Sequence, residues 1–110
     1  MKNNVYQVEI EVGHMEGTQL PEDCGGGFVN VYIAADSLVE AVKKSEGHLF
    51  SDCYKPVETV AAYAIDLEAY EEENMALDEE ERGPNQEILE KLQINGGVWY
   101  GAFHLYPKED

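Results

Sequence analysis

The sequence predicts an α+β fold in which a four-stranded, mostly antiparallel sheet carries two helices on one face, in the chain order β-β-α-β-α-β. Two observations lead to this prediction. Four segments alternate polar and apolar residues or are rich in β-branched and aromatic residues, and two further segments carry apolar residues at helical spacing. With 110 residues, 44% of them hydrophobic, the chain fits a single domain, residues 1–110, built around one core.

The four expected strands cover residues 6–12, 28–35, 57–65 and 98–106. In the first of them, Tyr6, Val8, Ile10 and Val12 alternate with polar residues, so we expect one buried face and one exposed face. The segment 13–27 contains five glycines and a proline and is expected to be a long loop.

The first expected helix covers residues 37–50 and begins at a capping box, because Ser37 is followed three residues later by Glu40. The second covers residues 85–94 and ends before Gly96, which is suited to the left-handed conformation that stops a helix. Between the two helices, residues 67–71 are expected to form only a short helical turn, capped by Asp66. Two helices of this length can cover one face of a four-stranded sheet, which makes a two-layer sandwich. This architecture resembles the ferredoxin-like family, and the extra leading strand makes it a variant of that order.

The expected core consists of the apolar residues that face the helices or lie on them. These are Tyr6, Val8, Ile10, Val29, Val31, Ile33, Leu38, Val42, Ile88, Leu92, Trp99 and Phe103.

The charge of the chain is strongly unbalanced, with 23 acidic and 7 basic residues and a formal net charge of −16. Such a field repels nucleic acid and anionic membranes and attracts basic surfaces, so the expected partner is a basic protein and neither nucleic acid nor a membrane. No apolar run approaches the length of a membrane span, and the N-terminus does not resemble a secretory signal, so we expect a cytoplasmic location. Solubility alone is the alternative explanation of the charge.

No pattern in the sequence favours catalysis or a cofactor. The triple glycine at 25–27 precedes a strand, whereas a phosphate-binding loop opens a helix. Cys24, Cys53 and the three histidines lack the spacings of zinc sites. We therefore expect no catalytic residue, no metal, no cofactor and two free thiols. An enzyme that uses His104 with a nearby carboxylate as acid and base is kept as an alternative.

Two groups of residues are expected to bind the partner. The first is the carboxylate segment 66–81, which holds nine carboxylates in sixteen residues; its expected contact residues are Glu71, Glu72, Glu73, Asp78, Glu79 and Glu80. The second is an aromatic face of the sheet, expected to point away from the helices, with Tyr32, Tyr100, His104 and Tyr106. Tyrosines are frequent where the binding energy of an interface concentrates, unless another part of the chain covers them.

The segment 29–44, together with the later strand in 54–65, looks like a strand-helix-strand unit found in many small bacterial proteins. In size, acidity and element order the chain resembles the immunity proteins of bacterial toxin systems, which are cytoplasmic inhibitors of toxic enzymes. Immunity proteins share no common signature, so the resemblance assigns no residue a role. It implies an inhibitory domain that binds and neutralises a basic toxin, often a nuclease. The alternative is a homodimeric α+β module that binds a small ligand or a protein, with its aromatic sheet face at the two-fold contact.

Overall fold

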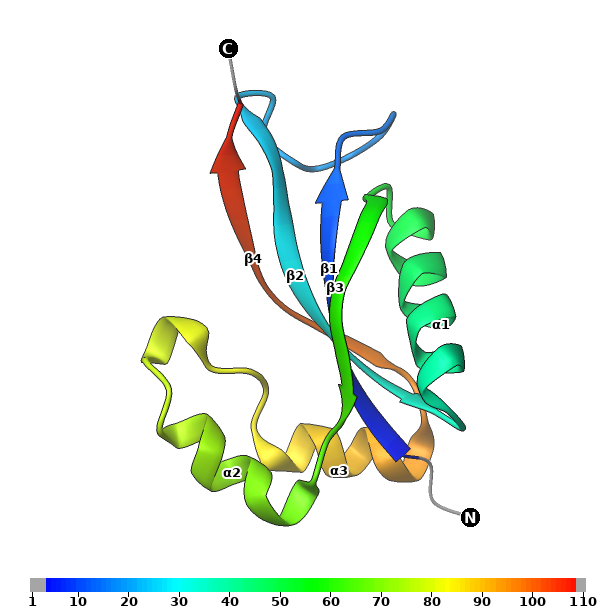
Figure 1. The fold of residues 1–110 in the computed structure, drawn as a ribbon, viewed down its shortest axis with the longest axis vertical. Helices are drawn as coiled ribbons and strands as arrows, with labels where there is room; N and C mark the ends of the chain where they lie inside the picture. The colour runs from blue at the N-terminus through cyan, green and yellow to red at the C-terminus, as the bar shows by residue number, and fades with distance from the viewer. Residues whose placement is uncertain (1–3, 109–110) are drawn as a thin grey trace.

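The computed structural model describes residues 4–108. Its elements are β1 (Asn4–Gly13), β2 (Cys24–Ala35), α1 (Leu38–Ser51), β3 (Lys55–Ala64), α2 (Leu67–Met75), the 3-10 turn η1 (Glu79–Glu81), α3 (Gln86–Asn95) and β4 (Val98–Pro107). The α+β class and the four-stranded antiparallel sheet are confirmed (Figure 1). The described residues contain three α-helices, whereas the sequence predicted two. The additional helix is α2, where only a short helical turn was expected.

The strands lie in the order β3-β1-β2-β4, and every neighbouring pair is antiparallel. β1 and β2 are the two inner strands, and the alternating pattern of β1 supplies a row of apolar side chains to one face. Val8, Ile10 and Val12 are fully buried in that row. β3 and β4 are therefore the two edges of the sheet.

Helix α1 covers the face of the sheet that carries this row, which we call the first face. Its buried residues Ala41, Ser45 and Leu49 are spaced four residues apart and therefore lie on one side of the helix. Ala41 and Leu49 pack in one cluster with the buried side chains of β1 and β2. The helix thus joins the sheet through a narrow stripe that begins at Ala41.

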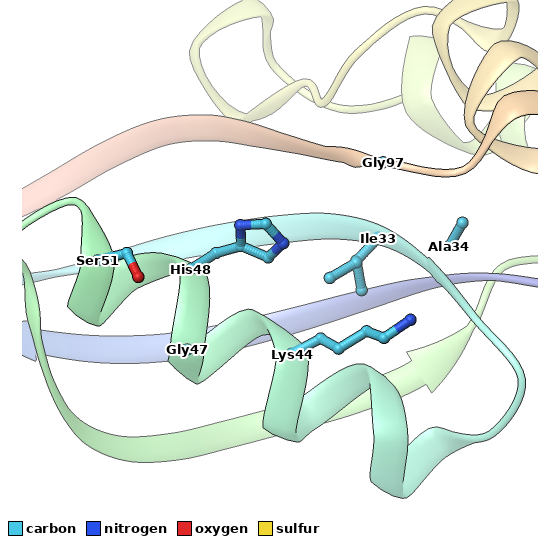
Figure 2. A pocket seen from close by; sticks show the side chains of 7 residues that line it. All are labelled: Ile33, Ala34, Lys44, Gly47, His48, Ser51 and Gly97. Atoms are coloured by element: carbon cyan, nitrogen blue, oxygen red, sulfur yellow. The ribbon is translucent and has the colours of Figure 1, made fainter.

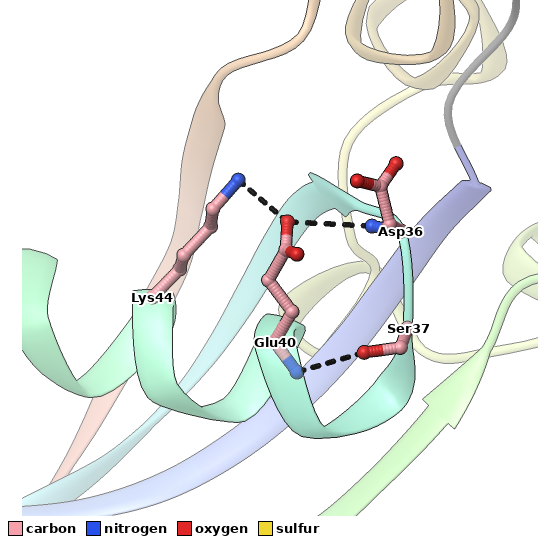
Figure 3. Close-up of polar contacts among 4 residues, drawn as sticks. All are labelled: Asp36, Ser37, Glu40 and Lys44. Carbon is pink, nitrogen blue, oxygen red and sulfur yellow. Dashed lines mark hydrogen bonds and ion pairs between the residues drawn. The ribbon is translucent and has the colours of Figure 1, made fainter.

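The predicted capping box of α1 is present with one difference (Figure 3). The Ser37 hydroxyl accepts a hydrogen bond from the backbone N–H of Glu40 at 3.1 Å. The Glu40 carboxylate reaches back to the N–H of Asp36, at 3.4 Å, instead of that of Ser37, and also pairs with Lys44 at 2.8 Å. These contacts hold the pKa of Glu40 below its usual range, with the Lys44 contact contributing most.

Helices α2 and α3 pack on the opposite face, which we call the second face. Successive side chains of a strand point to opposite faces, so Val5 of β1 and Tyr32 of β2 face away from α1. They form a second buried cluster with Leu89 and Leu92 of α3 and with Tyr70 of α2. The prediction that the helices share one face is therefore wrong, and the two-layer, ferredoxin-like arrangement is not confirmed.

An irregularity in the pairing of β2 with β4 decides which aromatic residues share a face. The step from Tyr100 to Phe103 covers three residues on β4 but two on β2. Both side chains therefore pack against the first-face core. Trp99, His104 and Tyr106 lie on the second face. The prediction that placed Tyr100 with His104 and Tyr106, and Phe103 with Trp99, is corrected, because alternation alone does not count the extra residue.

β2 begins at Cys24, inside the glycine-rich segment, so the loop is shorter than predicted. Gly26 has a φ of 157°, and a side chain there would collide with the backbone oxygen of Val12 and with the ring of Tyr106. Tyr106 crosses β2 at this point and donates a hydrogen bond to the Glu11 carboxylate at 2.6 Å. The glycines therefore let an aromatic ring lie across a strand.

The edge strand β3 contains two irregularities. Its register against β1 shifts twice, and Val57 and Val60 have no paired residue on β1. Both side chains are exposed, at 56% and 50%. β3 also begins two residues earlier than predicted, at Lys55 and Pro56.

Seven of the twelve residues expected in the core are buried, namely Tyr6, Val8, Ile10, Val29, Val31, Ile33 and Leu92. Val42, Ile88 and Phe103 are partly buried. Leu38 and Trp99 are exposed, at 44% and 38%. Leu38 precedes the buried stripe of α1, and Trp99 lies on an edge strand on the face that α1 does not cover.

Leu49→Ala is expected to lower the free energy of unfolding by roughly 2–5 kcal/mol, because it leaves a cavity in the core. Leu38→Ala on the same helix is expected to cost less than about 1 kcal/mol, because that side chain is exposed. Urea unfolding of both variants, followed by the fluorescence of the single tryptophan, measures the difference. Equal losses would contradict this placement of α1.

Ser45→Ala is expected to stabilise the protein by about 0.5–1 kcal/mol. The Ser45 hydroxyl is buried and has no hydrogen-bond partner among the described residues, so alanine removes a desolvated polar group and favours the helix. Ser37→Ala removes the cap of the same helix and is expected to cost about 1 kcal/mol. Thermal and urea unfolding of the two variants should therefore shift in opposite directions.

Candidate functional site: a pocket of tyrosines and carboxylates

Helix α2 is capped by Asp66, whose side chain accepts a hydrogen bond from the N–H of Glu68 at 3.0 Å. The predicted cap is confirmed, but the helix continues to Met75 instead of stopping after one turn. Leu67, Tyr70 and Asn74 supply the reason, because their spacing of three and four residues places them on one side of the helix. This spacing is present in the sequence, but the many carboxylates around it favoured the interpretation as a solvated loop.

Two side chains of α2 fasten the loop that leads to α3. The Asn74 amide oxygen accepts a hydrogen bond from the N–H of Gly83 at 2.8 Å, and its NH₂ group donates to the Gly83 carbonyl at 3.4 Å. The Tyr70 hydroxyl donates to the Pro84 carbonyl at 2.6 Å. A side chain at Gly83 would collide with the hydroxyls of Tyr32 and Tyr70, so only glycine lets the loop approach them this closely.

Arg82 fastens the other end of the loop. Its guanidinium donates to two backbone carbonyls near the C-terminal end of α2, at 3.1 and 3.2 Å. Met75 is the last residue of α2, so its carbonyl has no partner inside the helix, and the guanidinium bonds to it and to the carbonyl of Leu77 just beyond the helix. The cation that is nearest in sequence to Glu79–Glu81 is therefore directed to the backbone of α2.

A pocket of about 370 Å³ lies between this loop, α2 and the second face, and we call it the tyrosine pocket. Its lining residues come from three strands, from α2, from η1 and from the loops next to them. They are Gln7, Tyr32, Tyr63, Ala64, Ile65, Asp66, Tyr70, Glu73, Asn74, Leu77, Glu81 and Gly83. Lysine, arginine and histidine are absent from this lining.

The hydroxyls of the three pocket tyrosines remain protonated at neutral pH. Burial raises the pKa of Tyr70 to about 12, and Tyr63 adds to the effect. Burial also raises the pKa of Tyr32, followed by the influence of Tyr70 and Tyr63. The pKa of Tyr63 is raised first by burial and then by the negative charges of Glu9 and Glu73. The pocket thus presents neutral hydroxyls and aromatic rings on its walls.

The carboxylates of the pocket lie at its exposed side. Asp66, Glu73 and Glu81 line it and are solvent-exposed. An adjacent hollow of about 360 Å³ shares Gln7, Leu77 and Glu81 with the tyrosine pocket and adds Glu9, Asn30 and His104. Together they form a groove on the second face whose charged residues are mostly acidic.

The structure brings together part of the predicted binding residues. Tyr32 and Glu73 line the tyrosine pocket, and His104 lies in the adjacent hollow. The other predicted carboxylates, Glu71, Glu72, Asp78, Glu79 and Glu80, are exposed on α2, on η1 and before it.

Two predicted residues lie elsewhere. Tyr106 is further along the second face, where its ring lies 5.7 Å from that of Phe28. Tyr100 lies on the first face and donates a hydrogen bond to Asp52 at 2.7 Å. Burial, followed by this contact, raises the pKa of Tyr100. Tyr100 therefore does not share a face with Tyr106, and its role in binding stays a prediction.

Another hollow, of about 400 Å³, lies on the other side of the sheet, between α1 and the start of β4 (Figure 2). Lys44, His48 and Ser51 of α1 line it opposite Ile33 of β2 and Gly97. Lys44 is already paired with Glu40. This hollow holds none of the predicted binding residues.

Among residues 4–108, no group of three or more histidine, cysteine, aspartate or glutamate side chains could hold a metal ion. Cys24 and Cys53 are free thiols, as predicted. His14 Nε2 lies 3.7 Å from the Cys24 sulfur but 2.7 Å from the Cys24 carbonyl oxygen. Because that oxygen only accepts hydrogen bonds, Nε2 carries a proton and cannot take one from the thiol.

Comparison of the chain with protein-family models, with curated proteins and with solved structures gives no match. None of the helices within the described range has both the length and the apolar character needed to cross a lipid bilayer. The tyrosine pocket and the carboxylates that line it are therefore the candidate functional site.

Tyr70→Phe is expected to make the protein less sensitive to alkaline pH. The pKa of Tyr70 is about 12 in the folded protein against an ordinary value of 10.0, so the folded state holds this proton more tightly. That stabilisation is complete below pH 10 and is lost as the pH rises towards 12. Urea midpoints measured across this range should fall less steeply for the variant. An equally steep fall would show that Tyr70 does not contribute to the alkaline loss of stability.

Proposed function

We propose that this domain binds a basic protein and thereby inhibits it, as an immunity-type protein that neutralises a basic toxin such as a nuclease. One observation carries the proposal. Three of the nine carboxylates of segment 66–81, those of Asp66, Glu73 and Glu81, line the tyrosine pocket, and among the described residues none of the nine forms an ion pair with a basic side chain.

The ion pairs that the described residues do form lie elsewhere. Lys44 pairs with Glu40 within α1, and Lys91 pairs with Glu87 within α3. The Arg82 side chain bonds to backbone carbonyls. The negative charge at this end of the molecule is therefore not neutralised internally. Dispersed charge would be sufficient for solubility, so a concentrated acidic surface beside aromatic rings favours a basic partner.

The two kinds of residue would have different roles in binding. Exposed carboxylates act over distances of up to about 8 Å at physiological ionic strength and mainly speed the encounter with a basic surface. Tyrosine rings act at contact distance and mainly slow dissociation. Both kinds meet at the tyrosine pocket, which supports it as the centre of the interface.

The direct test looks for a basic enzyme domain encoded next to the gene of this protein and measures binding between the two. We expect the two proteins to co-purify and to bind with a dissociation constant below about 1 μM, which corresponds to a binding free energy of roughly −8 kcal/mol. Binding of this domain should also abolish the enzymatic activity of the partner. Tight binding without inhibition would restrict the proposal to a binding module. Affinity weaker than about 1 μM for that domain would contradict it.

A triple charge reversal, Asp78→Lys with Glu79→Lys and Glu80→Lys, is expected to lower the association rate constant by about tenfold or more at low salt. The dissociation rate should change by less than about threefold, because exposed charges add little to the final contact. Stopped-flow measurements at two salt concentrations separate these effects.

The matched control is Glu16→Lys with Glu22→Lys and Asp23→Lys, in the exposed loop before β2. It changes the net charge equally but lies at the end of β1 that is remote from α2 (Figure 1). A clearly smaller effect is expected. Equal effects would show that total charge, and not the carboxylate segment, governs association.

A homodimer is the second candidate, and the uncovered part of the second face favours it. Phe28 and Tyr106 lie there, outside the cluster that α2 and α3 form with the sheet, whereas Tyr32 belongs to that cluster and is only 3% exposed. A dimer would therefore use this remaining half of the face. Light scattering of the purified protein distinguishes the two candidates, and a monomer in the absence of a partner would contradict the homodimer.

A further inference from the structure

We propose that the tyrosine pocket receives a positively charged side chain of the basic partner, the guanidinium of an arginine or the ammonium of a lysine. This inference rests on the proposed function, since the partner is the same basic protein, and it names the place where one of its cations is held.

The size of the pocket fits a single side chain. Its volume of about 370 Å³ is near the lower end of the range of roughly 300–1,000 Å³ for small-molecule sites. The end of one long side chain can enter such a space, whereas a helix or a strand cannot. The pocket is thus suited to hold one residue that projects from a larger interface.

The walls suit a cation. A guanidinium or ammonium group is attracted to the face of a tyrosine ring within about 6 Å, and the attraction grows when water is excluded. Tyr32 and Tyr70 are buried parts of the wall, and Tyr63 is half exposed at its side. The hydroxyls of these residues, which stay neutral at physiological pH, can accept hydrogen bonds from the cation.

The charges around the pocket select against other ligands. Asp66, Glu73 and Glu81 line it without a lysine, arginine or histidine among them. An anion would be repelled, and an apolar side chain would remove water from carboxylates without offering them a hydrogen bond. A guanidinium offers five N–H donors, which suit carboxylate oxygens.

The pocket is also held in shape before a partner arrives. Asn74 exchanges two hydrogen bonds with Gly83, and Tyr70 bonds to Pro84, so the loop that forms one wall is fixed to the helix that forms another. A site that does not need to order on binding loses less free energy to entropy.

The first part of the test needs no partner and uses a small probe. N-acetyl-arginine amide is titrated into the isotope-labelled protein and followed by NMR. The reporters are the side-chain amide of Asn74 and the backbone amide of Gly83, which both line the pocket. We expect saturable shifts at these groups. N-acetyl-citrulline amide, which has a similar shape but no charge, should bind at least about tenfold more weakly.

Two double variants locate the site. Glu73→Gln with Glu81→Gln keeps the shape of the pocket side chains and should weaken binding of the arginine probe by at least about fivefold. Glu16→Gln with Glu22→Gln makes the same change in net charge far from the pocket and should weaken it by less than about twofold. Equal binding of citrulline and arginine, or equal loss in both double variants, would overturn the inference.

The second part uses the basic partner and separates the two proposals. Glu73→Gln with Glu81→Gln should raise the dissociation rate of the complex by about tenfold, and the remote double variant should not. If the partner binds, but the arginine probe does not bind in the pocket and the double variant leaves the dissociation rate unchanged, the inference fails and the proposed function stands. If the probe saturates the pocket but no basic protein binds, the proposed function fails and the pocket is a site for a free small cation.

Discussion

The distribution of apolar residues on the two faces of β1 is the constraint from which the rest of the structure follows. On the first face every side chain from Tyr6 to Val12 is buried, so this face needs cover along its whole length, and α1 provides part of it. On the second face only Val5 is apolar, and the positions that follow it are Gln7, Glu9 and Glu11. Cover is therefore needed at one end alone, and this requirement places α2 and α3 there.

The formation of helix α2 brings like charges together at a cost in free energy. Exposed carboxylates one turn apart on a helix, such as Glu68 and Glu72, repel each other by a few tenths of a kcal/mol per pair. Helix α2 is also too short to be stable on its own. It is held by the burial of Tyr70 and by the bonds of Asn74 to the following loop. Packing thus holds the carboxylates of α2 close together although they repel each other, and a cation near them reduces that repulsion.

Local features of the fold could be predicted from the sequence, and features that depend on distant residues could not. The alternation in β1, the Ser37 cap and the stop at Gly96, with a φ of 76°, each depend on a few neighbouring residues. The extra residue in β4 becomes visible only when β2 is paired with it. The tyrosine pocket joins residues from Gln7 to Gly83, so its composition follows from the packing of α2 and not from any motif.

The irregular edge strand has a consequence for how the protein behaves at high concentration. An unpaired strand edge is a template onto which another chain can add, and such addition leads to aggregation. Along β3, Pro56 removes a backbone donor, Lys55 places a charge at the start of the strand, and two register shifts interrupt its regular line of N–H and C=O groups. Val57 and Val60 can therefore remain exposed without an ordered ladder beside them. The irregularities therefore disfavour the addition of another chain along this edge of the sheet.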